Sequence, residues 1–401
     1  MKSVNRITVA LIGFGMFVAA VPASASDWPN FRGPKHDGIS TEKKLKTAWD
    51  KAGPKVLWQR EIGAAYSSLA CVDKRVYTCG TKGGRQVLFC LDAKSGDVIW
   101  KKPFEKEYSD GQGDGTRATP TVDDGRVYIF GSHGRLVCLD AKKGKEIWSR
   151  EFNRKPQWGY SGSVLIQDDL AIVSPGQPDG GLCALNKKTG QPAWSCGDDE
   201  AGYATPYPFA FEGKRYVCGF LAHSAIIAEL ETGKEVWRVP WETDWNVNAA
   251  MPIFHEGYLF LSSGYRTGCG LFKLAVDGDK LSAKEVWRSK VLMSKFQTPV
   301  LYKGKLYASD QSSLNCVDFL TGERHWRKRR VKHGTVLLAD GYLIVLTEKG
   351  QLRIAKAGPD GFEPSAKARI LKGRCWSVPV LSDGRLYARN MEKVVCLDLK
   401  P

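Results

Sequence analysis

The chain has 401 residues, more than one ordinary domain contains, so its length predicts either two domains or one large repeat architecture. Hydrophobic residues make up 43% of it and there are 13 tryptophans, which supplies a packed core and excludes a disordered or collagen-like chain. The formal net charge of +16 fits an anionic partner, or a solvated basic surface that has no specific partner.

Residues 1–25 have the three parts of a cleaved signal peptide. Lys2 and Arg6 form a basic start, residues 7–21 form an apolar run, and Ala23-Ser24-Ala25 is the small-x-small pattern that signal peptidase recognises. The sequence therefore predicts export.

The same apolar run bears on membrane attachment. It has about 15 residues, fewer than the roughly 20 that cross a bilayer, and no later apolar stretch is longer, so no transmembrane segment is predicted. A lipoprotein would carry a cysteine where Ser26 stands. We therefore expect a periplasmic or secreted protein without a lipid anchor, in which residues 26–55 form an N-terminal extension.

Regularly spaced tryptophans organise the rest of the chain. They recur about every 45 residues, the period of a β-propeller blade, at Trp58, Trp100, Trp148, Trp194, Trp237, Trp287 and Trp326. In five repeats a glycine stands four residues earlier: Gly96, Gly144, Gly190, Gly233 and Gly322. A hairpin turn that needs a positive φ explains the glycine, and the tryptophan on the next strand is then expected to face the neighbouring sheet.

The two ends of the repeat region are incomplete in complementary ways. After a full unit over residues 333–371, with Ile370 in the place of the tryptophan, the last unit (residues 376–399) has three strands and no tryptophan strand. Residues 56–59 are a tryptophan strand without a blade. Joining the two fragments closes the ring and removes exposed sheet edges. The sequence thus predicts an all-β protein, a single eight-bladed antiparallel β-propeller over residues 56–401 that is closed by its N-terminal strand.

The strand pair Leu-Asp-x-x-x-Gly-x-x-x-Trp, as in residues 91–100 and 139–148, resembles the PQQ-like β-propeller repeat over nearly the whole chain. A closer resemblance, to the BamB-like bacterial subfamily, is carried by the opening Asp27-Trp-Pro-Asn-Phe-Arg-Gly-Pro-Lys-His-Asp-Gly-Ile-Ser40, by Trp158-Gly-Tyr-Ser161 and by Gly373-Arg-Cys-Trp376. The resemblance implies one of two activities, quinoprotein oxidoreduction or the protein scaffolding of the outer-membrane assembly factor BamB.

The resemblance also says what a quinone enzyme would need. Quinoprotein dehydrogenases of this fold hold PQQ over the channel, between a tryptophan and a disulfide of two adjacent cysteines. Ca²⁺ lies beside the quinone, and long inserts in the chain form walls around the cofactor. This sequence has no Cys-Cys pair, and eight blades leave little chain for inserts. We therefore expect neither PQQ nor Ca²⁺ as a cofactor and no catalytic residue, with a PQQ-dependent oxidoreductase kept as the alternative function.

Other chemical motifs are weak. No histidine pair has zinc-ligand spacing. Asp110-x-Gln112-x-Asp114-Gly115 is similar to the start of a calcium loop, but Thr121 stands where the bidentate glutamate would be. We expect no metal site.

The sequence has 11 cysteines, an odd number. Five occupy equivalent repeat strands and are interpreted as small buried hydrophobes, because equivalent strands are too far apart for bridges: Cys90, Cys138, Cys183, Cys316 and Cys396. Cys71 and Cys79, on consecutive strands, are the one pair that could form a disulfide, and the sequence leaves this open.

Residues just before the inner strands are expected to ring one mouth of the tunnel. Aligning the units places there the candidate ligand-binding residues Tyr66, Arg117, Tyr160, Tyr203, Asn248, Phe296, His333 and Trp376, with Trp158 beside them. One interpretation is that these large side chains plug the tunnel. The other is a shallow site that stacks aromatic rings on a ligand and pairs cations with its anionic groups.

A basic run, residues 324–332, enters the same face. Exported proteins rarely meet nucleic acid, so we expect an envelope protein or an anionic glycan as the partner. The leading hypothesis is a non-catalytic, monomeric binding or scaffold propeller. An acidic-polysaccharide binder is a second alternative.

Overall fold

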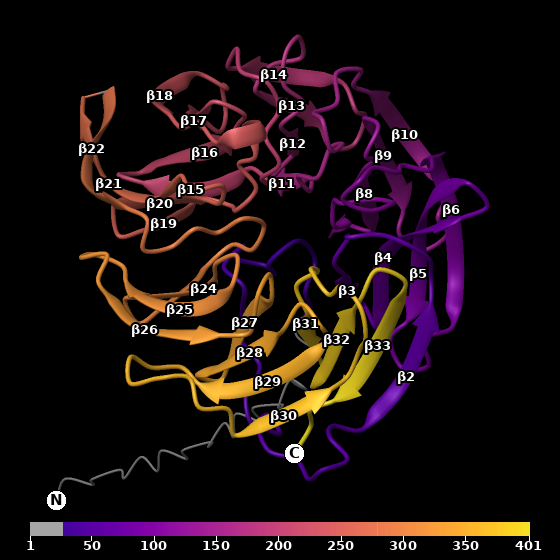
Figure 1. The fold of residues 1–401 in the computed structure, drawn as a ribbon. Coiled ribbons are helices and arrows are strands. Elements are labelled where there is room, and N and C mark those ends of the chain that lie inside the picture. Colours follow the sequence, from indigo (N-terminus) through magenta and orange to yellow (C-terminus); the bar gives the residue numbers. More distant parts are fainter. Residues whose placement is uncertain (1–26, 279) are drawn as a thin grey trace, which may run out of the picture.

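The computed structural model describes residues 27–278 and 280–401; the expected signal peptide lies outside them. The described residues form eight sheets arranged as a ring around one axis (Figure 1). First strands of neighbouring blades contact one another, β3 with β7 and β7 with β11, so these strands surround the axis. The predicted all-β, eight-bladed propeller is confirmed.

Blades 1 to 4 each contain four antiparallel strands that follow one another outward from the axis. Their strands are, in blade 1, β3 (Ala70–Val72), β4 (Arg75–Lys82), β5 (Arg85–Asp92) and β6 (Val98–Lys106); in blade 2, β7 (Thr121–Asp123), β8 (Arg126–Phe130), β9 (Arg135–Asp140) and β10 (Glu146–Glu151); in blade 3, β11 (Leu165–Gln167), β12 (Leu170–Val173), β13 (Leu182–Asn186) and β14 (Pro192–Cys196); and in blade 4, β15 (Tyr207–Phe211), β16 (Lys214–Phe220), β17 (Ser224–Glu229) and β18 (Glu235–Pro240).

Blades 5 to 8 repeat the pattern, and a short 3₁₀ helix, η1 (Asp244–Asn246), precedes them. Their strands are, in blade 5, β19 (Ile253–His255), β20 (Tyr258–Ser263), β21 (Gly268–Asp277) and β22 (Lys280–Ser289); in blade 6, β23 (Val300–Tyr302), β24 (Lys305–Ser309), β25 (Ser313–Asp318) and β26 (Arg324–Arg329); in blade 7, β27 (Thr335–Ala339), β28 (Tyr342–Leu346), β29 (Gln351–Lys356) and β30 (Ala366–Arg369); and in blade 8, β31 (Val380–Ser382), β32 (Arg385–Arg389) and β33 (Lys393–Asp398).

The N-terminal strand completes blade 8. β2 (Val56–Glu61) pairs antiparallel with β33, and Trp58 lies opposite Cys396, as predicted. The assignment of Ile370 to the tryptophan position of blade 7 is wrong, because β30 ends at Arg369 and Ala366 pairs with Ile354. A small residue is enough there since Trp49, from the chain before β2, packs against this blade and donates from Nε1 to the Lys367 carbonyl at 3.2 Å.

Each repeated tryptophan connects its blade to the next. Trp100 Nε1 donates to the carbonyl of Ala141 at 3.0 Å, and its ring lies over Gly144, which has φ +68°. Trp148 repeats this contact with the Lys187 carbonyl at 3.0 Å and with Gly190. The glycine of each turn is therefore required twice, once for its backbone conformation and once for the space that the neighbouring indole occupies.

We expect Gly144→Ala to lower the free energy of unfolding by about 2 kcal/mol, because strain at positive φ adds to displacement of an indole. The new Cβ would lie 2.7 Å from ring atoms of Trp100. Gly125→Ala is the matched control, since Gly125 has φ +70° and nothing within 4 Å of its added Cβ, so it should cost about 1 kcal/mol from strain alone. Denaturant unfolding checks this, and equal losses would contradict the packing role.

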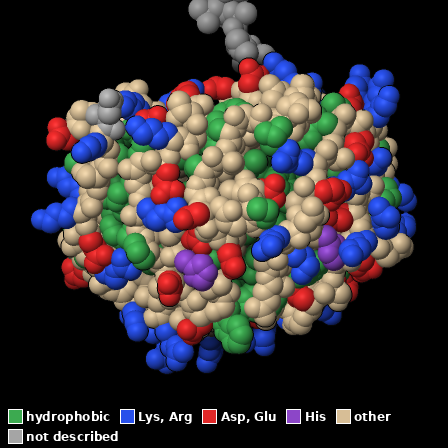
Figure 2. All heavy atoms as spheres, turned by 90° about the horizontal axis from the view of Figure 1, so that it is seen from above, with side chains coloured by type: hydrophobic (Ala, Val, Ile, Leu, Met, Phe, Trp, Pro, Cys, Tyr) green, Lys and Arg blue, Asp and Glu red, His purple; other side chains and the backbone are tan. Residues whose placement is uncertain are grey.

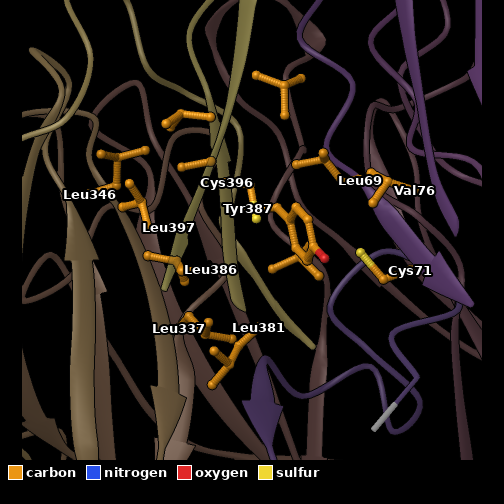
Figure 3. Close-up of a cluster of buried hydrophobic side chains, with 14 of the residues drawn as sticks. Leu69, Cys71, Val76, Leu337, Leu346, Leu381, Leu386, Tyr387, Cys396 and Leu397 are labelled. Carbon is orange, nitrogen blue, oxygen red and sulfur yellow. The ribbon is translucent and has the colours of Figure 1, made fainter. Parts of the chain in front are cut away.

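The hydrophobic core is continuous where the two chain ends meet. Leu69, Cys71 and Val76 of blade 1 lie near Tyr387 and Cys396 of blade 8 (Figure 3), and all five are buried. Leu337 and Leu346 extend the same cluster into blade 7 (Figure 3). Burial of these side chains closes the ring with packing as well as with strand pairing.

The cysteines are free thiols. The five repeat cysteines are buried, as predicted. Cys71 and Cys79 are not bridged; Cys71 lies opposite Val76 and Cys79 opposite Leu88. Burial raises the pKa of the Cys79 thiol to about 12 and the pKa of Cys71 well above its usual value, which suppresses thiolate chemistry.

The segment from Asp27 to Ser40, here called the plug, occupies the channel, and Figure 1 shows this indigo chain crossing the middle of the ring. Trp28 pairs with Cys71 of β3, and β1 (Ile39–Ser40) runs parallel to β27. Between them, Arg32 is fully buried and donates to the carbonyls of Thr298 at 3.0 Å and Pro299 at 2.6 Å, before β23. The plug therefore contacts the inner strands of blades 1, 6 and 7 at once.

The outer wall has mixed charge. Figure 2 shows Lys and Arg side chains interspersed with Asp and Glu over one side of the ring. Among the described residues, no helix has the length and apolar character needed to cross a membrane.

Candidate functional site

A cavity, here called the mouth cavity, lies at the end of the tunnel where the inner strands begin. The volume open to the centres of water-sized molecules in it is about 170 Å³. Six of the nine predicted site residues line it: Tyr66, Arg117, Trp158, Tyr203, Phe296 and Trp376. Because every inner strand starts at this rim, the ring geometry brings together residues far apart in sequence.

Three aromatic side chains from blades 1, 6 and 8 form one wall. Tyr66 stacks on Trp376, with ring centroids 5.4 Å apart and an interplanar angle of 19°. Phe296 lies against the same indole at 5.0 Å. His333 contacts Trp376 at 5.3 Å, is not among the residues that line the cavity, and is bonded through Nδ1 to Glu348 Oε2 at 3.4 Å. Burial lowers the pKa of His333.

The second wall comes from blades 3 to 5. Trp158 lies 6.1 Å from Tyr203 and 6.3 Å from Trp245, measured between ring centroids. Trp245 is 63% exposed and has φ 72°, an unusual conformation for a bulky residue. Its loop is tied to the next one by an ion pair of 3.1 Å between Arg266 and Asp244. The loop thus presents a large aromatic ring at the rim in spite of the cost of backbone strain.

Arg117 reaches the cavity but is already engaged by the protein. Its guanidinium pairs with Asp110 at 2.8 Å and donates to the carbonyls of Gly113 at 2.8 Å, Trp158 at 3.1 Å and Gly115. It also lies over the ring of Tyr108 at 4.3 Å. Arg117 therefore fixes the loop over residues 108–116, and its substitution would disturb that loop as well as any ligand.

Two predicted site residues point away from the mouth cavity. Tyr160 is buried against Phe130, with ring centroids 4.5 Å apart, and its hydroxyl donates to the Pro175 carbonyl at 3.0 Å. Asn248 is fully buried, and its Nδ2 donates to three backbone carbonyls while its Oδ1 accepts from Ser263 Oγ at 2.6 Å. Both side chains serve packing between blades.

Hydroxyl groups form the lower part of the wall. The amide of Ser68 donates to Thr119 Oγ1 at 3.1 Å, the amide of Thr119 to Ser163 Oγ at 2.9 Å, and the amide of Ser163 to Thr205 Oγ1 at 2.9 Å. This chain of bonds connects blades 1 to 4 below the aromatic rings, and all four residues line the cavity.

Sequence reasoning missed Phe31 and Tyr265. Phe31 lines the cavity from the plug, so the tunnel is closed beneath the aromatic walls. Tyr265 comes from the loop between β20 and β21 and has φ 54°. The signal for Phe31 was the opening motif at residues 27–40, which has no strand period. For Tyr265, the repeat predicts that its loop lies at this rim, because the loop joins the second and third strands of a blade, but no motif singles out the tyrosine.

Cations surround the aromatic walls. Lys295 Nζ lies 4.6 Å from the centroid of Tyr265 and 4.9 Å from that of Phe296. Arg374 lies over Trp376 at 4.5 Å and donates to the Tyr66 hydroxyl at 2.6 Å. The described residues that line the cavity include neither aspartate nor glutamate. The site is therefore aromatic and hydroxylic inside, with positive charge at its edge.

Solved structures resemble this chain at low sequence identity. BamB from Moraxella catarrhalis is 16% identical with a TM-score of 0.63, covering 86% of this chain and 99% of that one. A quinohemoprotein alcohol dehydrogenase from Comamonas testosteroni is 14% identical with a TM-score of 0.65, covering 94% and 81%. A europium-containing methanol dehydrogenase is 12% identical with a TM-score of 0.66, covering 93% and 89%. These likenesses show the fold, which both kinds of protein share.

A search of the curated proteins found no match. A protein family described as outer membrane protein assembly factor BamB matches residues 41–197, 84–237 and 221–400. Since these matches together span nearly the whole propeller, the chain belongs to the BamB-like family of PQQ-type β-propeller repeats.

Proposed function

We propose that the protein is a non-catalytic binding propeller of the periplasm or the secreted space, which acts as a monomer and engages its ligand or partner at the mouth cavity. The observation that carries this proposal is the cavity itself: stacked aromatic rings stand over a ring of hydroxyl groups, and Phe31 closes the tunnel beneath. Concave, mostly apolar sites with a few convergent polar groups are typical of ligand binding.

The donor set of the cavity supports the absence of quinone chemistry. A Ca²⁺-bound quinone needs carboxylate oxygens as metal ligands and a carboxylate as a base. No carboxylate lines the cavity among the described residues, and they contain no cluster of His, Cys, Asp and Glu suited to a metal ion. These residues do not fit the quinone and its metal, and we derive no step through them.

We expect Trp376→Ala and Trp158→Ala to abolish retention of envelope material on the immobilised protein, because each removes a stacking surface from the cavity. Lys94→Ala and Lys142→Ala are matched controls, since both residues are exposed in β5–β6 and β9–β10 turns, at the blade ends opposite the mouth. The measurement is mass spectrometry and glycan analysis of the material retained from an envelope extract by each variant.

The opposite pattern, with retention lost in the turn variants and kept in both tryptophan variants, would place the site on the rim opposite the mouth cavity and contradict this proposal.

Addition of PQQ and Ca²⁺ to the purified protein tests the alternative function. A bound quinone chromophore together with dye-linked alcohol or sugar oxidation would overturn the non-catalytic assignment.

A further inference from the structure

Lys295 is a cation at the edge of the mouth cavity. Its side chain is half-buried between the rings of Tyr265 and Phe296, and no carboxylate within 4.0 Å pairs with it in the part of the chain that the structure describes. Burial lowers the pKa of Lys295. A desolvated ammonium group without a counter-ion is unfavourable, and an anion bound beside it would remove that penalty.

The aromatic neighbours of Lys295 connect it to a second cation. Phe296 contacts Trp376, and Arg374 lies on the same indole. Arg374 is exposed, and its described partners are the Tyr66 hydroxyl and the Gln112 carbonyl, so it also has no carboxylate partner there. The acids near this wall are already paired, Glu348 with His333 at 3.4 Å and Asp110 with Arg117 at 2.8 Å. Positive charge therefore exceeds negative charge around the Phe296–Trp376 pair.

The same wall contains two buried polar atoms without partners among the described residues. They are Nε1 of Trp376, a donor, and Oε1 of Gln297, an acceptor. Gln297 is 4% exposed and holds its position by donating from Nε2 to the His333 carbonyl at 2.9 Å. Buried polar groups are normally satisfied, so an unused donor and an unused acceptor on residues that line one cavity favour a ligand that carries hydroxyl groups.

The shape of the site favours a sugar over a protein surface. The face of a pyranose ring carries C–H groups that pack on aromatic rings, while its hydroxyls lie around the edge. Trp376 and Trp158 line the cavity from its two aromatic walls, and Ser163 and Thr205 line it with hydroxyl groups. Among the described residues, Trp245 is the large apolar side chain that is exposed near this rim. A protein partner would need a broader apolar patch.

We propose that the mouth cavity binds an acidic oligosaccharide, with one sugar ring packed against the aromatic wall of Tyr66, Phe296 and Trp376 and its carboxylate or sulfate groups accepting hydrogen bonds from Lys295 and Arg374. This proposal rests on the proposed function and specifies its ligand class. The cations at the edge of the cavity would recognise the negative charge of the ligand, and the aromatic wall inside would recognise its sugar ring. A neutral sugar would therefore lack the ionic contacts, and an anionic peptide would lack the contacts of the sugar ring.

The test measures binding of four probes to the full mature protein by calorimetry: oligogalacturonate, a heparin hexasaccharide, maltohexaose and hexaglutamate. We expect the acidic sugars to bind at least 10-fold more tightly than maltohexaose and hexaglutamate, with affinity that falls as salt rises. The carboxylated and sulfated probes identify which anionic group is preferred.

Lys295→Met should weaken binding of the preferred acidic sugar about 10-fold and reduce the salt dependence, whereas Lys295→Arg should keep both. Trp376→Phe, which keeps a ring but removes the N–H donor, should weaken binding less than Trp376→Ala. Lys142→Met, on the opposite rim, should bind as the unaltered protein does. Melting temperatures within a few degrees show that the variants are folded.

Equal affinity for maltohexaose and oligogalacturonate, or unchanged binding in Lys295→Met, would overturn the assignment of an acidic ligand while leaving the proposed binding function intact. Preference for hexaglutamate would replace the glycan with an acidic protein segment. If no sugar binds while Trp376→Ala still abolishes retention of envelope material, the ligand class is wrong and the mouth site stands; if retention is also unchanged in Trp376→Ala, both proposals fail.

Discussion

Arg389→Met should lower the free energy of unfolding by more than about 4 kcal/mol, the largest loss we expect from one substitution outside the binding site. Arg389 is fully buried on β32 and donates to the carbonyls of Ser67 at 3.1 Å, Cys79 at 2.6 Å and Met391 at 3.0 Å, and to Thr78 Oγ1 at 3.0 Å. Methionine fills the space but leaves these acceptors unsatisfied, at about 1–3 kcal/mol each.

The position of Arg389 explains why the effect should be large. Its acceptors belong mainly to blade 1, while the residue itself is in blade 8, so one guanidinium connects the two blades in which the ends of the ring meet. Burial lowers the pKa of Arg389 to about 10, and no carboxylate within 4.0 Å pairs with it among the described residues. The charge is stabilised by backbone dipoles, which only a group with many N–H donors can engage.

Arg60→Met is the matched control for this prediction. Arg60 is in β2 of the same blade, and it pairs at the surface with Asp97 at 2.7 Å. A surface pair contributes up to about 1 kcal/mol, so the control should unfold within that range of the unaltered protein. Guanidinium unfolding followed by tryptophan fluorescence measures both. A similar loss in the two variants would show that Arg389 has no special part in ring closure.

The ring could be predicted from the sequence because each of its elements is repeated. Trp100 and Gly144 form a contact between neighbouring blades, and Trp148 and Gly190 form the same contact one repeat later. The plug has no such repetition. Its position depends on interactions that occur once in the chain, such as the hydrogen bonds that Arg32 donates to carbonyls before β23. No periodic pattern in the sequence indicates that an arginine is buried there.

The predicted residues lie around one tunnel mouth, but His333, Tyr160 and Asn248 do not line the mouth cavity. Alternate residues of an extended chain face opposite sides, so an uncertainty of one residue reverses the direction of a side chain. Asn248 points into the packing between blades while its neighbours Val247 and Ala249 line the cavity. Tyr160 is replaced in the same way by Ser161. Alignment of turns fixes the rim, and the local path of the chain decides which residue faces the axis.

Acidification from pH 6.5 to pH 4 should remove about 3 kcal/mol of stability through His36 alone. His36 is buried in the plug, and burial, helped by the charge of Arg32, lowers its pKa from 6.5 to about 4. The unfolded chain therefore takes up a proton below pH 6.5 that the folded protein rejects until about pH 4. This contribution is complete above pH 6.5 and is lost as the pH falls through that window.

The measurement is the free energy of unfolding against pH for the unaltered protein and for His36→Asn. Asparagine suits this position because His36 has φ 57°, a conformation that asparagine tolerates. Burial raises the pKa of the neighbouring Asp37, which acts in the opposite sense, so the difference between the two curves isolates the histidine. His223→Asn, at an exposed residue of blade 4, should follow the unaltered protein. Because Phe31 of the plug closes the mouth cavity, acid should also weaken ligand binding in the unaltered protein more than in His36→Asn. Parallel curves of the free energy of unfolding against pH for the two proteins would contradict the role of His36.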